Sequence, residues 1–104
     1  MTIKKVEITP VFLVGEEFMP DDKDLKENHI YISEHWGGMT HLCLCGCKQK
    51  TYMPINENEH DRSGWNLIKE KNGKISITPS VGNFSGENPC HAHYIITNNI
   101  ANFV

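Results

Sequence analysis

Four cysteines in a chain of 104 residues limit its folding more than any other feature. Three of them, Cys43, Cys45 and Cys47, alternate with single residues, and the fourth, Cys90, lies far away in the sequence. Disulfides suit this spacing poorly, because the three clustered cysteines sit too close together to pair well with one another and only Cys90 is available outside the cluster. Four thiolates are instead enough for a closed tetrahedral zinc site.

The spacing of the clustered cysteines also constrains the backbone around them. Residues i and i+4 of a straight strand lie about 13 Å apart, whereas two thiolates on one zinc ion lie no more than about 4.6 Å apart. The segment from Cys43 to Cys47 must therefore fold back on itself, and Gly46 is the residue that permits the turn. Zinc would join this hairpin tip to the segment that carries Cys90. In so small a core such a link can decide whether the chain folds.

Nearby histidines leave the ligand set open, because His41, His91 and His93 can each replace a cysteine. Cys90 and His93 also match one half of a Rieske-type iron–sulfur pattern. The other half of that pattern, C-x-H, occurs here only in reversed order, from His41 to Cys43. Zinc is therefore the expected metal.

Composition and charge predict one small folded domain over residues 1–104. About a quarter of the residues are Leu, Ile, Val or Phe, which is above the level typical of disorder. The net charge is −3, from ten basic and thirteen acidic residues, and no basic stripe is visible. We therefore expect no binding to nucleic acid or membranes. The chain has no apolar run of membrane-spanning length and no signal-peptide pattern, so we expect a cytoplasmic protein with reduced cysteines.

Short strands separated by turns, with little or no helix, predict a small, mainly β domain of antiparallel hairpins. The clearest hairpin joins strands on either side of Asn72-Gly73, two residues that supply the positive φ angles of a type I′ turn. Its second strand is expected to end at Pro79. A second hairpin, with its turn at Asn98-Asn99, is expected to join His93–Thr97 and Ile100–Val104. Pro10 suits an edge position or a bend between Val6–Ile8 and Val11–Val14. The remaining predicted strands are Ile30–Ser33, His41–Cys45 and Thr51–Ile55.

Ser80 and His93 are a candidate nucleophile and base. Ser80 is expected where a strand gives way to a turn, and Gly82 can bring backbone N–H groups close to an oxyanion. If residues 90–93 are extended, Cys90 can hold the metal while His93 points into a cleft. A serine in a turn more often makes local hydrogen bonds, so the pattern leaves both interpretations open. The residues that can orient the histidine are Glu34, Asp61 and Asn83.

An ordered set of blocks resembles a small bacterial and phage family known as a domain of unknown function. Its members often lie beside genes for ubiquitin-like proteins and their E1- and E2-like enzymes. The chain differs from the usual blocks at Leu44, Lys48 and Ala92, where the family has proline, glycine and serine. The matching blocks are His41-Leu42-Cys43-Leu44-Cys45-Gly46-Cys47, Trp65 before a hairpin, Pro79-Ser80-Val81-Gly82-Asn83, and Cys90-His91-Ala92-His93-Tyr94.

The resemblance implies a zinc-stabilised peptidase that cleaves after the C-terminus of a ubiquitin-like protein, either to process its precursor or to remove it from its conjugates with target proteins. Carried over onto this chain, it makes Ser80 the nucleophile and His93 its base. Two other functions stay open: a non-catalytic zinc module that binds a partner protein, and a metallopeptidase with an open position on the zinc. The implied zinc ligands are Cys43, Cys45, Cys47 and Cys90. The implied substrate-binding residues are His41, Gly82 and Asn83, of which His41 can instead support the site from behind.

Overall fold

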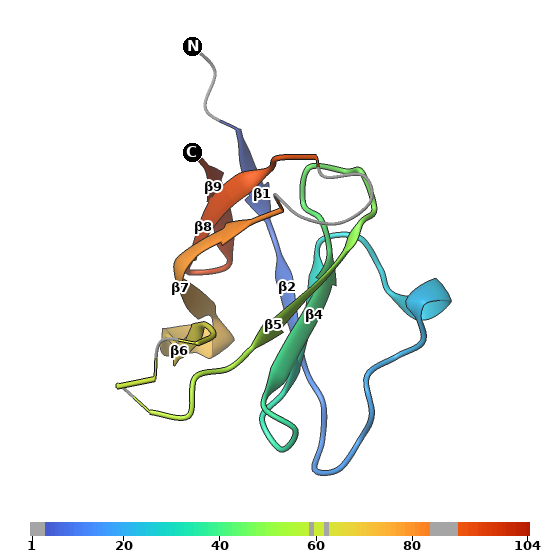
Figure 1. Cartoon of the computed structure of the whole chain (residues 1–104), viewed down its shortest axis with the longest axis vertical. Helices are drawn as coiled ribbons and strands as arrows, with labels where there is room; N and C mark the ends of the chain where they lie inside the picture. Colours follow the sequence, from blue (N-terminus) through green and yellow to red (C-terminus); the bar gives the residue numbers. More distant parts are fainter. Residues whose placement is uncertain (1–3, 59, 62, 84–89) are drawn as a thin grey trace.

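A computed structural model describes residues 4–58, 60–61, 63–83 and 90–104, and these residues form two β-sheets (Figure 1). The five-stranded sheet has the order β1 (Lys5–Glu7), β9 (Ile100–Phe103), β8 (His93–Thr97), β7 (Ile75–Gly82) and β6 (Asn66–Lys69). The four-stranded sheet has the order β2 (Thr9–Phe12), β3 (His29–Ser33), β4 (Gly38–Leu42) and β5 (Lys50–Pro54). In the described part of the chain, helix is limited to two short 3₁₀ turns, Asp22–Asp24 and Lys71–Gly73. The expected mainly β fold is confirmed.

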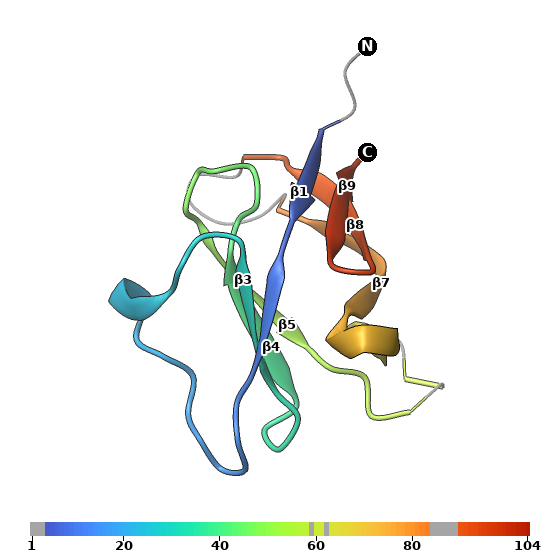
Figure 2. The ribbon, with the colours of Figure 1, turned by 180° about the vertical axis from the view of Figure 1, so that it is seen from behind.

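One extended stretch contributes an edge strand to each sheet. The chain leaves β1 and enters β2 through Ile8, which is buried in the core (Figure 2). β2 pairs with β3 in parallel, whereas the other strand pairs of both sheets are antiparallel. Pro10 lies in β2 at the edge of its sheet, as predicted, where a residue without an N–H is tolerated.

The hydrophobic core takes side chains from both sheets. Ile30 and Met39 from the four-stranded sheet and Ile77 and Ile96 from the five-stranded sheet are all fully buried in one cluster. Burial of such large aliphatic side chains is the main source of stability in a domain of this size. The core therefore fixes which faces of β7 and β8 point inward, and so which side chains of those strands face outward.

Both predicted tight turns are confirmed by their backbone angles. Asn72 and Gly73 have φ of 62° and 76° between β6 and β7, and Asn98 and Asn99 have φ of 49° and 65° between β8 and β9. Asparagine and glycine adopt this left-handed conformation at the lowest cost.

The expected end of the strand before Pro79 is wrong. β7 continues to Gly82, and its pairing with β8 shifts register between Ile77 and Val81. Pro79 lies inside that shifted stretch and one residue beyond the last residue of β7 that pairs with β6, Thr78. Its missing N–H therefore removes no ladder hydrogen bond.

The described residues contain no helix long and apolar enough to cross a membrane.

Candidate active site and metal centre

The three clustered cysteines lie in a tight turn after β4 and not in a strand. β4 spans Gly38–Leu42, so the strand predicted over His41–Cys45 begins and ends three residues earlier than expected. The Cys43 N–H donates to the Gln49 carbonyl at 2.7 Å, and the Gly46 N–H donates to the Cys43 carbonyl at 3.2 Å. Gly46 has φ of 96°, the left-handed conformation that allows the chain to reverse as predicted.

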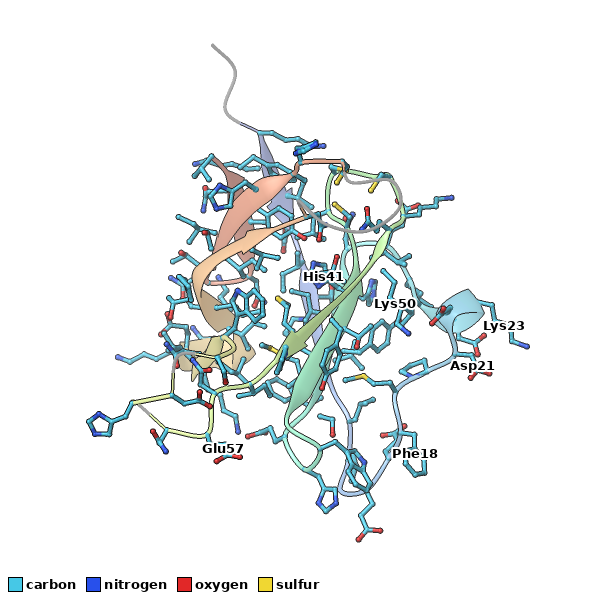
Figure 3. All side chains as sticks on the ribbon, in the orientation of Figure 1. Phe18, Asp21, Lys23, His41, Lys50 and Glu57 are labelled. Carbon is cyan, nitrogen blue, oxygen red and sulfur yellow. The ribbon has the colours of Figure 1, made fainter. Side chains whose placement is uncertain are left out.

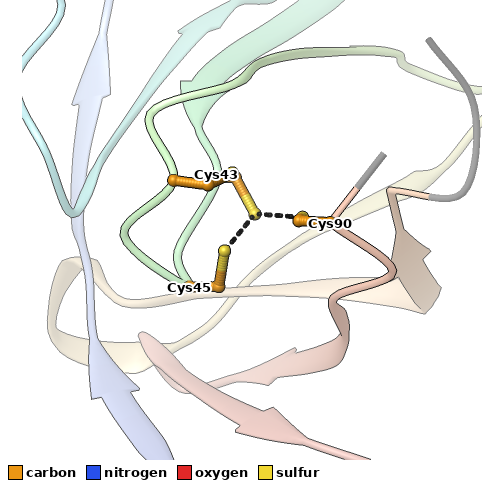
Figure 4. Close-up of side chains that lie close together, drawn as sticks. Cys43, Cys45 and Cys90 are labelled. Carbon is orange, nitrogen blue, oxygen red and sulfur yellow. Dashed lines mark hydrogen bonds between the residues drawn. The ribbon is translucent and has the colours of Figure 1, made fainter. Parts of the chain in front are cut away.

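This turn brings its thiols against Cys90, which lies just before β8. The four Sγ atoms all lie within 4.8 Å of one another. Cys43 Sγ is 3.4 Å from Cys45 Sγ and 3.5 Å from Cys90 Sγ (Figure 4). Four thiolates around tetrahedral zinc lie about 3.8 Å apart at a Zn–S distance of about 2.3 Å. The cluster therefore fits a metal ion, and its four cysteines are free thiols and not disulfides.

The cluster consists of cysteines alone. His41, His91 and His93 do not join the four cysteines in the group of described residues that can hold a metal. A Rieske-type centre needs two histidine ligands, so this arrangement disfavours it. Four thiolates fill the coordination sphere of tetrahedral zinc and leave no open position for a substrate.

The thiols differ in how readily they lose a proton. Burial raises the pKa of Cys43 to about 12. Burial acts in the same direction on Cys90, but the Ala92 N–H and the neighbouring thiols outweigh it and lower the pKa of Cys90 to about 7. Metal binding at neutral pH must therefore displace protons from the cluster, most of all from Cys43.

A buried polar pair lies beneath the metal cluster and links the two sheets. His41 on β4 is fully buried inside the molecule (Figure 3), and its Nε2 is 2.6 Å from the Tyr94 hydroxyl on β8. Burial lowers the pKa of His41 to about 4, so the ring is neutral at physiological pH. No surface of its ring is open to a substrate.

Ser80 and His93 meet on the outer face of the five-stranded sheet, opposite to the face that carries Tyr94. His93 Nε2 is 2.5 Å from Ser80 Oγ, and both residues are partly exposed. Gly82 pairs with His93 across β7 and β8, and Ser80 lies two residues before Gly82 on the same face of the strand. Val81 and Tyr94 pair between them and point into the core. The register of the two strands therefore brings a hydroxyl and an imidazole together at the surface.

Two local features hold this pair in place. The indole Nε1–H of Trp65 donates to the Ser80 carbonyl at 3.0 Å. The only signal for this contact in the sequence is a tryptophan before the hairpin. Residues 90–93 were expected to be extended, but His91 has φ of 58°, which is not an extended conformation. The backbone reverses at His91, and Cys90 reaches the metal cluster while His93 still faces Ser80.

The three residues considered for orienting His93 engage other groups. Glu34 forms an ion pair with Lys69 at 2.8 Å. Asp61 accepts the Ser63 hydroxyl within its own loop. Asn83 is 6 % exposed, and its side chain bonds to Thr51 at 2.9 Å.

Comparison with known proteins identifies one matching family. No curated protein and no solved structure matches the chain. The model of one protein family, described as the bacterial ubiquitination-like system serine protease BubE, matches residues 16–104. That range contains all four cysteines and the contact between Ser80 and His93. The chain belongs to the BubE family of serine proteases of bacterial ubiquitination-like systems.

Proposed function

We propose that this chain is a serine peptidase that cleaves the bond following the C-terminal residue of a bacterial ubiquitin-like protein. Ser80 is the nucleophile, His93 is the general base, and the four cysteines hold a structural zinc ion. The contact between Ser80 Oγ and His93 Nε2 carries the proposal, because a serine becomes nucleophilic when a base accepts its proton. The family description supports the reaction class and the ubiquitination-like context.

The reaction follows from the positions of these two side chains. Ser80 Oγ attacks the scissile carbonyl while His93 Nε2 takes the hydroxyl proton. The tetrahedral intermediate then collapses, His93 gives the proton to the leaving amine, and the ubiquitin-like C-terminus stays on Ser80 as an ester. Water, activated by the same imidazole, hydrolyses this ester and restores the free serine.

Gly82 supports binding of an extended substrate at this face. It lies directly across from His93 in the β7–β8 pairing, and it has no side chain to cover the outer surface there. A substrate backbone can therefore approach the imidazole closely, and backbone N–H groups near Gly82 are the proposed donors to the oxyanion. Such a surface suits the slender C-terminal tail of a ubiquitin-like protein.

The zinc ion is proposed to act on the fold and not in the reaction. Its ligands come from the turn after β4 and from the segment before β8, so it joins the two sheets. Four thiolates complete its coordination, which argues against a metal-activated water. The ion would hold Cys90, and with it the start of β8 at His93, in a fixed position relative to the core.

The decisive experiment is cleavage of a ubiquitin-like precursor encoded with the protease. We expect wild-type protein to release the C-terminal extension, Ser80→Ala to abolish release, and Ser63→Ala, a serine in an exposed loop, to leave it unchanged. Mass spectrometry of the products locates the cleaved bond. If Ser80→Ala cleaves as fast as wild type, the serine mechanism is wrong.

The same assay separates the two alternative functions. A non-catalytic zinc module would bind the ubiquitin-like protein without cleaving it, and its binding would not depend on the Ser80 hydroxyl. A metallopeptidase would lose activity on chelation while keeping its fold by circular dichroism. The proposed enzyme should instead lose activity and structure together when zinc is removed.

A further inference from the structure

The side-chain amide of Asn83 is buried beside the metal cluster, and only its oxygen has a hydrogen-bond partner among the described residues. Its Oδ1 accepts the Thr51 hydroxyl at 2.9 Å, and the residue is 6 % exposed. Its Nδ2 is buried without a hydrogen-bond partner among the described residues. A buried amide donor normally has a partner, because leaving one unpaired is costly. This N–H group is therefore available to an acceptor that becomes strong only in another state of the site.

The Asn83 side chain acts on Cys43, whose sulfur is the acceptor that we consider. Asn83 bonds through its backbone to His91, next to Cys90, and through its side chain to Thr51. Thr51 lies two residues after Gln49, whose carbonyl accepts the Cys43 N–H, so the Asn83 amide lies between the two parts of the cluster. A neutral thiol is a weak acceptor, whereas a metal-bound thiolate carries charge and only accepts. The hydrogen bond from Thr51 holds Oδ1 on the far side of the amide, which leaves the N–H group for the sulfur.

We propose that Asn83 is a positioning residue of the metal centre, whose Nδ2–H donates to the Cys43 thiolate in the metal-loaded protein. This inference rests on the four-cysteine metal site of the proposed function. Outer hydrogen bonds of this kind fix the orientation of metal ligands and tune their charge.

The backbone of Asn83 extends this role to the strands of the active site. Its N–H donates to the Ala92 carbonyl, and its carbonyl accepts the His91 N–H, both at 2.9 Å. These two bonds hold the residues between Cys90 and His93. Through its side chain, Asn83 also contacts β5 at Thr51, and it lies three residues after Ser80. One residue thus joins a metal ligand to both strands that carry the Ser80–His93 contact.

The test compares metal binding by wild type, Asn83→Asp and Asn83→Ala. Asn83→Asp keeps the acceptor for Thr51 but turns a carboxylate oxygen toward the thiolate, and we expect zinc affinity to fall about 10- to 100-fold by competition with a chromophoric chelator. In the cobalt(II)-substituted protein, the thiolate-to-metal charge-transfer band should move to longer wavelength in both variants. Loss of a hydrogen bond raises the energy of the sulfur electrons, whereas a purely structural role would not shift this band.

A matched control is Asn66→Asp, which adds the same charge on the edge strand β6, away from the cysteines. We expect its zinc affinity and cobalt spectrum to equal those of wild type. If Asn83→Asp does not fold, Asn83→Ala must show the same shift in the same direction. Wild-type affinity and an unmoved band in the Asn83 variants overturn the inference. Failure of wild type to bind one zinc per chain refutes the metal centre itself.

Discussion

Alternate side chains at the β7–β8 pairing face two different environments. Val81 and Tyr94 point into the core, where the Tyr94 hydroxyl meets His41, whereas Ser80 and His93 point outward and meet each other. Adjacent residues of a strand necessarily face opposite sides. The buried pair therefore supports the strands from within at the position where the reactive pair is displayed.

Replacement of His93 tests the base assigned to the reaction. We expect His93→Ala to lower the rate of cleavage by about 10²- to 10⁴-fold, because general-base assistance contributes on this order. Zinc content should stay at one per chain, since the metal cluster contains no histidine. His91→Asn is the control: His91 is exposed and has φ of 58°, which asparagine tolerates, so the rate should not change. Equal losses in the two variants would contradict the assignment.

Replacement of Tyr94 tests the buried pair. Tyr94→Phe removes the hydroxyl that contacts His41 Nε2 at 2.6 Å and leaves that ring nitrogen buried without its partner. We expect the free energy of unfolding to fall by about 1–3 kcal/mol, measured by urea denaturation. Tyr52→Phe is the matched control, because Tyr52 is 55 % exposed and should change stability little. Equal stability of the Tyr94 variant and wild type would show that the contact contributes nothing.

The strands and turns of the chain were predictable where local chemistry determines them. Asn72-Gly73 and Asn98-Asn99 adopt the positive φ angles of tight hairpins, and Pro10 lies at a sheet edge. The path through Pro79 was not predictable, because it depends on a register shift imposed by pairing with β8. The reversal at His91 likewise depends on distant partners in the fold.

The candidate site was predictable only in part. The four-cysteine metal cluster was predictable from residue type and spacing, because four cysteines at these positions suit a tetrahedral metal site better than disulfides. The contact between Ser80 and His93 depends on the β7–β8 register, and single-residue patterns do not determine that register. The partners of Asn83 and His41 come from the other sheet, at Thr51 and Tyr94 respectively, so sequence alone gave no reason to pair them.

The turn between β6 and β7 gives a test at the level of one element. Gly73 has φ of 76°, and a Cβ added there meets no atom within 4 Å. Gly73→Val should therefore destabilise the protein by about 1–2 kcal/mol through backbone strain alone, whereas Gly73→Asn should cost much less. Thermal unfolding followed by circular dichroism measures both. If the valine and asparagine variants have the same melting temperature, tolerance of the left-handed conformation is not the reason why glycine suits this position.

At the level of the whole molecule, the metal cluster is a second connection between the sheets beside the hydrophobic core. Cys43, Cys45 and Cys47 follow a strand of one sheet, and Cys90 precedes a strand of the other. The turn between β6 and β7 lies at the other end of β7 from the cluster (Figure 1). Loss of the metal should therefore affect the two ends of the molecule unequally.

Chelation under reducing conditions tests this directly. We expect the melting temperature to fall by more than about 10 °C, because a metal that binds only the folded state contributes its binding energy to stability. Amide hydrogen exchange should rise first at residues 42–49 and 90–94, while the turn at Asn72 keeps its protection. In Cys90→Ser, which lacks the ligand from the second sheet, chelation should lower the melting temperature far less. Uniform loss of protection, or an unchanged melting temperature after zinc is removed, would show that the two sheets do not depend on the metal.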